Sequence, residues 1–206
     1  MKNSKNIRLI ELLIVTAVAF GATLFKSVCI LLTGAEFTYS EFIKYPMIFM
    51  GSLTVNKLAI TALVIYFIIK PGRSLKELGF SWYWTDFFLS IVLLIVVELA
   101  TRLCSYLLYE VYYVTTNNYL YAAPKNIGFI KGGINVWSVA DKLVNPFFEE
   151  FFFRAYIISE VKFLTNNLGL AFFISVTLQG MCHLYQGFGS ALIVSVSFII
   201  FSLYYI

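Results

Sequence analysis

Charged residues are scarce in this chain. Only 13% of its 206 residues are Asp, Glu, Lys or Arg, against about 25% in an ordinary soluble domain. Apolar residues make up 60% of the sequence, and the mean hydropathy is +0.84. One soluble core cannot hide so much apolar surface from water. The composition therefore excludes a water-soluble globule and predicts a protein whose solvent is the lipid bilayer.

Basic stripes and disulfide frameworks are also absent. The net charge is +4, but the 15 Lys and Arg residues are scattered and form no run interleaved with aromatics. We therefore expect no nucleic-acid partner. The three cysteines, Cys29, Cys104 and Cys182, all lie inside apolar stretches. This placement suits small buried side chains better than a disulfide framework.

Long apolar stretches fill most of the sequence. A spanning helix needs about 20 mainly apolar residues, so five or six spans use the whole length. We expect six, over Leu9–Leu32, Met47–Ile69, Phe87–Tyr109, Pro146–Leu164, Leu168–Tyr185 and Phe188–Ile206. No repeat or low-complexity linker divides them. The predicted fold is an all-α, polytopic transmembrane helix bundle. It forms a single integral membrane domain over residues 1–206, with three N-terminal spans in 1–110 and the motif-bearing helices in 135–206.

The loops predict an orientation. Residues 110–144 contain Pro124, Gly128, Gly132 and Gly133, which indicates a loop with a short interfacial or re-entrant helix. Lys and Arg in short loops favour the cytoplasmic side of a membrane. The side of the N-terminus has Lys2, Lys5, Arg8, Lys70, Arg73, Lys76 and Lys162, and the other side has Lys44, Lys125 and Lys131. We therefore expect a cell-membrane protein with a cytoplasmic N-terminus.

A polar cluster interrupts the fourth apolar stretch, at Asn145-Pro146-Phe147-Phe148-Glu149-Glu150-Phe151-Phe152-Phe153-Arg154. Asn145 suits a helix N-cap, and Pro146 suits the first helical position, where a missing N–H is no loss. Both glutamates then lie close to the first turn, where the helix dipole favours carboxylates. Ionisable residues at mid-span cost roughly 2.5 to 3.5 kcal/mol and usually mark function.

Spacing separates the two glutamates. Glu150 and Arg154 are four residues apart, so they share a helix face and can neutralise one another. Glu149 points about a quarter-turn away and is freer to meet a group on another helix. In the alternative interpretation, both acids and the arginine form one internal ion-pair network that only lets the helix insert. The spacing leaves both interpretations open.

The single histidine of the chain lies on the next helix, where Ser175, Gln179 and His183 form a polar stripe at intervals of four. A lone histidine on a helix is more often a satisfied core residue than a catalyst. However, Glu149 and His183 each lie 17 residues from Asn166, in the turn between the two helices. Equal separations in an antiparallel hairpin mean equal depth, roughly 25 Å from the turn. The pair can therefore hold a water and remove its proton.

These residues resemble a known family. The run Glu149-Glu150-x-x-x-Arg154, followed about thirty residues later by His183-Leu-Tyr-Gln-Gly187, resembles the CPBP family of intramembrane proteases. This family is also called Abi, and it includes CAAX-processing enzymes and bacteriocin-processing or bacteriocin-immunity proteins. The loop from Lys70 to Phe80 is similar to the stretch that often links early spans in bacterial members.

The resemblance implies a role for each residue of the motif. Glu149 is implied to act with His183 as general base on the attacking water, Arg154 to orient the glutamates, and Glu150 to complete that ion pair. It also implies a metalloprotease with a divalent cation such as zinc, or a metal-free glutamate mechanism. The sequence lacks His-Glu-x-x-His, and one histidine with carboxylates is a poor zinc set beside the usual three protein ligands.

Two departures from the family pattern stand out. The family usually has Phe four residues before this histidine, where this chain has Gln179. The family also has a later helix with a second His followed by Asn or Asp, which is expected to hold the oxyanion, and this chain ends before it. The last span stops at Ile206 without a polar or basic tail. We expect a fragment or a truncated reading frame; a complete chain would lack part of its catalytic site.

Three functions are weighed. The first is an intramembrane endopeptidase that cleaves a hydrophobic or membrane-associated peptide and has membrane lipid as its other partner. The second is a non-catalytic membrane protein, such as a bacteriocin self-immunity factor or a scaffold. The third is a small channel or transporter that uses Lys57, Glu98 and Arg102. For that third set, a structural role is the alternative, with Glu98 paired to Arg102 or Lys57 to stabilise the bundle.

Overall fold

The apolar stretches fold as helices. The structure, a computed structural model, describes residues 2–33, 46–74, 78, 83–116 and 136–206, and all the extended regular elements among them are helical. In chain order they are α1 (Lys2–Thr33), α3 (Pro46–Ile69), α4 (Trp84–Thr116), α5 (Val136–Glu149), a π-helical segment (Glu150–Ile158), α6 (Ser159–Thr165), α7 (Leu168–His183), a short 3₁₀ turn (Leu184–Gln186) and α8 (Phe188–Tyr205). The predicted all-α membrane bundle is confirmed.

Much of the helical surface is suited to lipid. Within the described part of the chain, five helices are long and apolar enough to cross a membrane: Lys5–Cys29, Gly51–Ile69, Trp84–Val111, Leu168–Gln186 and Phe188–Tyr205. Their outward faces are apolar, and the most hydrophobic stretch of α4 contains no buried residue. Apolar surface of this extent is unfavourable in water, whereas it is not unfavourable in contact with lipid tails. The protein is therefore a multi-pass membrane protein.

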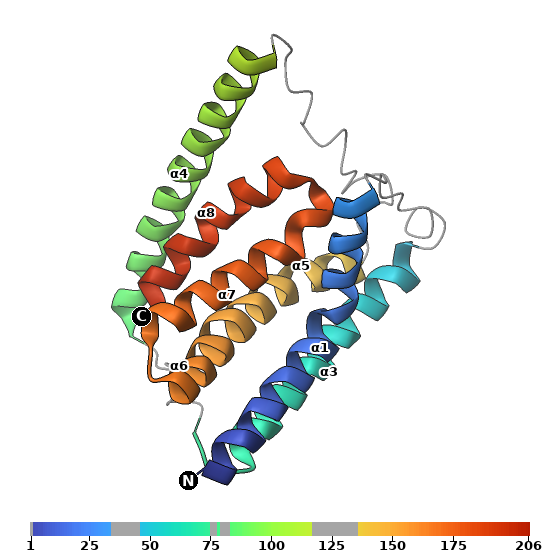
Figure 1. The fold of residues 1–206 in the computed structure, drawn as a ribbon, viewed down its shortest axis with the longest axis vertical. Helices are drawn as coiled ribbons and strands as arrows, with labels where there is room; N and C mark the ends of the chain where they lie inside the picture. Colours follow the sequence, from blue (N-terminus) through green and yellow to red (C-terminus); the bar gives the residue numbers. More distant parts are fainter. Residues whose placement is uncertain (1, 34–45, 75–77, 79–82, 117–135) are drawn as a thin grey trace.

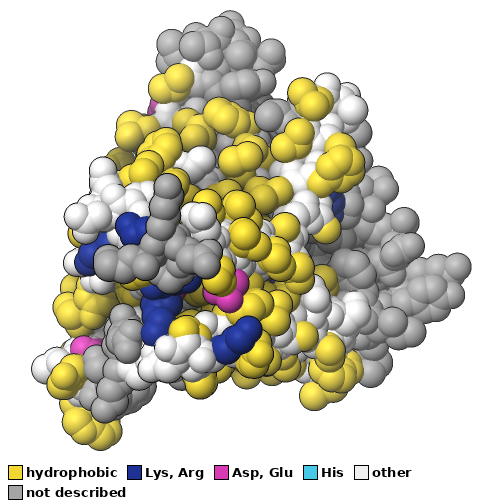
Figure 2. All heavy atoms as spheres, turned by 60° about the horizontal axis from the view of Figure 1, so that its bottom comes forward, with side chains coloured by type: hydrophobic (Ala, Val, Ile, Leu, Met, Phe, Trp, Pro, Cys, Tyr) yellow, Lys and Arg dark blue, Asp and Glu magenta, His cyan; other side chains and the backbone are white. Residues whose placement is uncertain are grey.

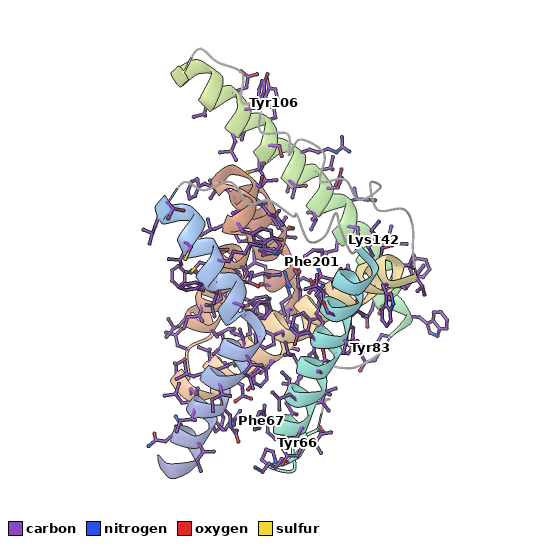
Figure 3. All side chains as sticks on the ribbon, turned by 90° about the vertical axis from the view of Figure 1, so that its right-hand side faces the viewer. Tyr66, Phe67, Tyr83, Tyr106, Lys142 and Phe201 are labelled. Carbon is purple, nitrogen blue, oxygen red and sulfur yellow. The ribbon has the colours of Figure 1, made fainter. Side chains whose placement is uncertain are left out.

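The helices pack around one central rod. Helix α5, the π-helical segment and α6 follow each other without a break from residue 136 to residue 165. Helices α1 and α3 run beside one another on one side of this rod, α7 and α8 lie on the other side, and α4 lies at the edge of the bundle against α8 (Figure 1). Side chains from all these helices fill the spaces between the ribbons (Figure 3).

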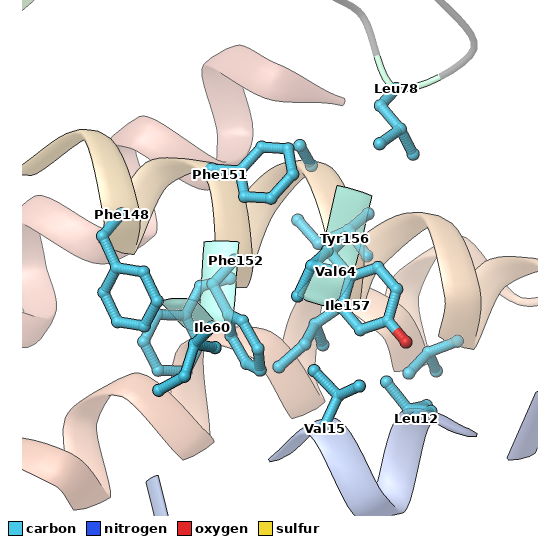
Figure 4. Packing of buried hydrophobic residues seen from close by; sticks show 14 of the residues in the cluster. Leu12, Val15, Ile60, Val64, Leu78, Phe148, Phe151, Phe152, Tyr156 and Ile157 are labelled. Atoms are coloured by element: carbon cyan, nitrogen blue, oxygen red, sulfur yellow. The ribbon is translucent and has the colours of Figure 1, made fainter. Parts of the chain in front are cut away.

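The π-helical segment forms the centre of the core. All residues from Phe151 to Ile158 are buried. They pack against apolar side chains of α1 and α3, such as Val15, Ile60 and Val64 (Figure 4). Phe20 of α1 contacts three aromatic rings of the rod, with ring centroids 4.6–5.6 Å apart. Aromatic packing of this kind fixes the position of the rod just beyond Glu149.

One prediction about this region is wrong, and another needs new bounds. The helix begins at Val136, so Asn145 is not its N-cap and Pro146 lies inside it. An internal proline removes a backbone donor and crowds the preceding turn, and here the backbone changes to π-helical spacing at Glu150. Both ends of the predicted 110–144 loop are also helical, since α4 continues to Thr116. The rest of that predicted loop, residues 117–135, lies outside the described residues.

The predicted turn between the rod and α7 is present. Asn166 ends α6 with a left-handed backbone, at φ 55° and ψ 28°, a conformation that asparagine tolerates better than most residues. Asn167 caps α7, because its side-chain oxygen accepts a hydrogen bond of 2.9 Å from the backbone N–H of Leu170. The rod and α7 are therefore an antiparallel hairpin, as the equal spacing of Glu149 and His183 requires.

A buried ion cluster ties the N-terminal end of the bundle together. Glu160 of α6 is 3% exposed and pairs with Arg8 of α1, at 2.6 Å between Oε2 and Nη2, and with Arg73 after α3. Lys5 donates to the backbone oxygen of Leu164 at 3.2 Å. Basic side chains gather on this end of the molecule (Figure 2). The N-terminus, the end of α3 and the end of α6 therefore lie on one side of the bundle.

Candidate functional site

Two polar stripes meet along the rod and α7. Ser175 donates to the backbone oxygen of Phe153 at 2.7 Å. One turn further along α7, Gln179 donates to Glu149 Oε2 at 3.1 Å. One more turn along, His183 Nε2 lies 3.9 Å from the same oxygen. The polar stripe of α7 therefore faces the rod and not the lipid, and it brings Glu149 and His183 together.

Glu149 is held by uncharged groups. Asn145, one turn earlier on α5, donates to Oε1 at 2.8 Å, and Gln179 donates to Oε2. Gln179 is only 1% exposed, so this amide is fixed by its packing. The two donors set the orientation of the carboxylate and leave its negative charge without a neighbouring ammonium or guanidinium among the described residues within ion-pair distance. Such a carboxylate can accept a proton from a bound molecule.

Glu149 and His183 both line a cavity of about 210 Å³. Its walls come from α1, α3, α5, the π-helical segment, the end of α7 and the 3₁₀ turn. The lining residues are Ala19, Phe20, Thr23, Leu53, Asn56, Lys57, Ile60, Asn145, Phe148, Glu149, Phe153, Cys182, His183 and Tyr185. The side chains of Glu149 and His183 are 19% and 18% exposed. Both can therefore reach a molecule in the cavity while aromatic walls limit the entry of bulk water.

A cation lies in the same cavity. Lys57 of α3 lines it, and its Nζ lies 2.5 Å from Oδ1 of Asp141 on α5. Asp141 is not among the described residues that line the cavity. The carboxylate compensates the charge of the lysine, which lowers the cost of a charged side chain inside a membrane protein.

Glu150 and Arg154 lie away from this cavity. Arg154 Nη1 is 2.9 Å from Glu150 Oε1, and the arginine side chain is 2% exposed. The guanidinium carbon lies 5.7 and 5.4 Å from the ring centroids of Phe198 and Phe201. Glu150 and Arg154 line a separate cavity of about 230 Å³ with Leu78 and Tyr205. The structure therefore forms the expected Glu150–Arg154 pair but separates it from Glu149 and His183.

The residues here do not form a metal site. No group of three His, Cys, Asp or Glu side chains that could hold a metal ion exists within the described ranges. Glu149 and His183 supply two ligand residues, and a catalytic zinc in a protein usually has three. The described residues therefore do not fit the zinc that the family resemblance implies.

Lys57, Glu98 and Arg102, the residues of the channel or transporter interpretation, form ion pairs in two separate places. Glu98 and Arg102 contact each other on α4, at 2.6 Å between Oε1 and Nε, and their side chains are 60% and 77% exposed. Lys57 pairs with Asp141 and not with Glu98. The three residues therefore do not line one path in this structure.

Sequence reasoning missed Asp141 and its contact with Lys57. Asp141, Asn145 and Glu149 follow each other at intervals of four, so they form a polar stripe on α5 that matches the stripe on α7. The signal was present in the sequence, but it disappears when the helix is started at Asn145. The contact between Lys57 and Asp141 joins residues 84 positions apart, and no local pattern predicts it.

The C-terminal part of the chain has a family match. Residues 132–206 match the family model described as "Type II CAAX prenyl endopeptidase Rce1-like". The match covers a little over a third of the chain and includes Glu149, Glu150, Arg154 and His183. It confirms the resemblance to the CPBP and CAAX protease family. No curated protein and no solved structure matches the chain.

Proposed function

Because residues 132–206 match a family model for CAAX prenyl endopeptidases, we propose that this protein is a membrane-embedded endopeptidase in which Glu149 and His183 activate water. One observation carries the proposal. The carboxylate and the imidazole come from antiparallel helices and lie 3.9 Å apart at the edge of a 210 Å³ cavity. A water that donates a hydrogen bond to Glu149 Oε2 and also lies about 2.8 Å from His183 Nε2 fits across that gap.

The proposed reaction is hydrolysis by general acid–base catalysis. The water oxygen bonds to the carbonyl carbon of the substrate while Glu149 takes one water proton. When the tetrahedral intermediate collapses, the C–N bond breaks and Glu149 gives that proton to the leaving nitrogen. The products are a carboxylic acid and an amine. His183 positions the water at its Nε2, which faces Glu149 Oε2.

Neighbouring residues support these two groups. Asn145 and Gln179 hold the carboxylate in one orientation, so little reorganisation is needed when the water is deprotonated. We propose that Arg154 acts through Glu150, which begins the π-helical segment directly after Glu149. This ion pair would hold the backbone of the rod in place next to the reacting carboxylate.

The walls of the cavity favour an apolar substrate. Phe20, Phe148 and Phe153 line it together with Leu53 and Ile60, and such walls limit water and admit hydrophobic groups. We propose a membrane-associated peptide or protein, bearing a prenyl-like group, as the substrate. We also propose that the protein lies in the cell membrane with its N-terminus cytoplasmic, because Arg8, Arg73 and their neighbours form the basic end of the bundle.

The test is cleavage of a peptide ending in farnesyl-Cys-Val-Ile-Met by the full chain in lipid vesicles, followed by mass spectrometry. Glu149→Gln and His183→Ala should each lower the rate at least a hundredfold at unchanged protein level, because general-base catalysis contributes about 10²–10⁴-fold. Glu98→Gln makes the same chemical change on the exposed face of α4 and is the matched control. Undiminished cleavage by both site variants would refute the roles, and an inactive wild-type chain would refute the activity.

One observation favours a second, non-catalytic function. Both oxygens of Glu149 already accept a hydrogen bond, and one donor is Gln179, where the family pattern has Phe. A membrane scaffold or bacteriocin-immunity protein could use the same cavity only to bind a partner. In that case, protection or binding survives the Glu149→Gln substitution, whereas the protease loses its activity.

A further inference from the structure

An ion pair lies in the middle of the membrane span of α4. Glu98 lies 14 residues after Trp84 and 13 residues before Val111, the two ends of that span. The side chains of Glu98 and Arg102 are 60% and 77% exposed. In a bilayer they would face hydrocarbon, although charged residues inside membranes almost always face other protein or water. The pair therefore indicates that another protein surface covers this face of α4.

The residues around the ion pair follow a seven-residue repeat. Two series with this spacing run along the same face of α4: Ile91, Glu98 and Ser105, and Ile95, Arg102 and Tyr109. Ser105 is half-buried, and the other five residues are exposed. A repeat of seven residues is the pattern by which two helices pack along a shared seam at a small crossing angle. This face therefore has the period of a helix–helix interface.

The contact of α4 with its own bundle lies on a different side of the helix. Helix α4 packs against α8 at the edge of the molecule (Figure 1). The half-buried residues Val97, Ala100 and Cys104 lie well over a quarter-turn away from Glu98 and Arg102, at about 100° per residue. The seam is therefore not used by α8 and remains available to a second molecule.

Small side chains beside the ion pair allow a second helix to come close. Thr101 and Ser105 lie four residues apart, next to the seam, and both are half-buried. Their hydroxyls donate to backbone oxygens of α4 itself, those of Val97 and Thr101, at 2.8 Å. Small residues at this spacing, with their polar atoms satisfied, are typical of interfaces between membrane helices.

The ion pair is complementary to itself across a twofold axis along the membrane normal. Two copies inserted in the same direction present the same residues at the same depth. Glu98 and Arg102 differ by about 6 Å along the helix axis, a separation that the two side chains already bridge within one chain, at 2.6 Å. Arg102 uses Nε for this contact, and a guanidinium has five N–H donors. It can therefore also bind the carboxylate of a second copy.

We propose that a second copy of this chain covers the seam of α4, in a parallel homodimer in which Glu98 of each copy pairs with Arg102 of the other. The four charges then alternate in sign and lie between two helices instead of against lipid. Such a contact is isologous and closes after two copies. The cavity of Glu149 and His183 is lined by other helices, so this inference goes beyond the proposed function and does not depend on it.

Charge reversal tests the pairing. The full chain is reconstituted in lipid vesicles, and the dimer fraction is measured by single-molecule photobleaching of labelled chains over a range of protein-to-lipid ratios. Glu98→Arg and Arg102→Glu each give the seam one sign of charge and should lower the association constant about tenfold or more. Mixed together, the two variants should form heterodimers. Glu98→Arg/Arg102→Glu restores alternating charges and should dimerise within about threefold of wild type.

Cross-linking tests the seam without any charge reversal, so its result holds even where a like-charged variant fails to insert. With Cys29, Cys104 and Cys182 replaced by Ala, Ile95→Cys should join two copies through a short bis-maleimide. Val96→Cys is the matched control, because Val96 is the next residue, at nearly the same depth, and is 46% exposed against 56% for Ile95. It points about 100° away from Ile95 and should cross-link far less.

The outcomes separate a second copy from other occupants of the seam. A dimer that needs opposite charges at positions 98 and 102 and cross-links through position 95 supports the inference. A chain that stays monomeric in vesicles leaves this face to lipid or to a different protein and overturns it. A dimer that is unchanged in Glu98→Arg, or that cross-links equally through position 96, also overturns it. None of these measurements requires cleavage, so they hold whether or not the protein is a protease.

Discussion

Glu149 and Glu160 lie on the same helical rod and have opposite surroundings. Glu160, at the basic end, is 3% exposed and pairs with Arg8 and Arg73. Glu149 accepts hydrogen bonds from two uncharged amides and faces an imidazole across a cavity. One acid has its charge compensated and no room for a ligand, and the other has room and no cationic partner among the residues that contact it.

The difference separates structure from chemistry. A carboxylate between two guanidinium groups is a poor base for a substrate proton, because both oxygens already bind cations. An acid inside a membrane without a cationic partner is costly to keep and therefore marks a functional site. The surroundings of the two acids, and not their burial alone, thus indicate that Glu160 joins three parts of the chain and that Glu149 is available for catalysis.

The largest effect is expected at Glu160. Glu160→Gln removes the buried anion that Arg8 and Arg73 share, which should lower the free energy of unfolding by about 3 kcal/mol. Thermal unfolding in detergent measures the loss. Glu149→Gln is the matched control and should change stability far less, because its partners are neutral amides. Equal destabilisation by the two substitutions would contradict the distinction between these acids.

A smaller effect is expected at Gln179. Gln179→Leu removes one of the two donors that orient Glu149, so kcat for peptide cleavage should fall about tenfold, or about 1.4 kcal/mol. Ser175→Ala, one turn earlier on the same stripe, removes a hydrogen bond to the backbone of Phe153 and not to Glu149. It should lower stability and leave kcat unchanged. The comparison fails if both substitutions lower kcat equally.

The packing behind the site can be tested at Gly180. A Cβ at this position would lie 2.8 Å from Ser195 Oγ of α8, so Gly180→Ala should cost about 1 kcal/mol of stability through overpacking. Adding Ser195→Ala removes the obstructing oxygen and should restore most of the loss. A double variant that is no more stable than Gly180→Ala would show that close approach of α7 and α8 is unimportant here.

The smallest effect is expected on α4. Glu98 and Arg102 pair on an exposed face, so replacing both with Gln should change the cleavage rate by no more than about twofold, as for surface sites in general. Cleavage in vesicles measures this directly. Ion flux that depends on Glu98 and Arg102 would instead support the channel interpretation and weaken the assignment of function to Glu149.

Local spacing predicted the reacting pair, but the extent of its helix was predicted wrongly. Asn145-Pro146 has the chemistry of a helix start, so the sequence did not show that the helix begins at Val136. As a result, Asp141 is not part of the predicted site. The roles of Glu149, Glu150, Arg154 and His183 in catalysis stay predictions, since the geometry brings only Glu149 and His183 together.

Hydropathy along the sequence was enough to determine a helical membrane bundle, and the regular rise of a helix was enough to predict the equal depth of Glu149 and His183. Each of these properties depends on residues that are close together along the chain. Only the tertiary structure decided which charges meet between different helices. Glu160 could have remained beside Lys162, and Lys57 beside Glu98, as far as the sequence shows, yet they contact Arg8, Arg73 and Asp141. Charge pairing between helices depends on how their faces pack, and packing is a property of the whole bundle.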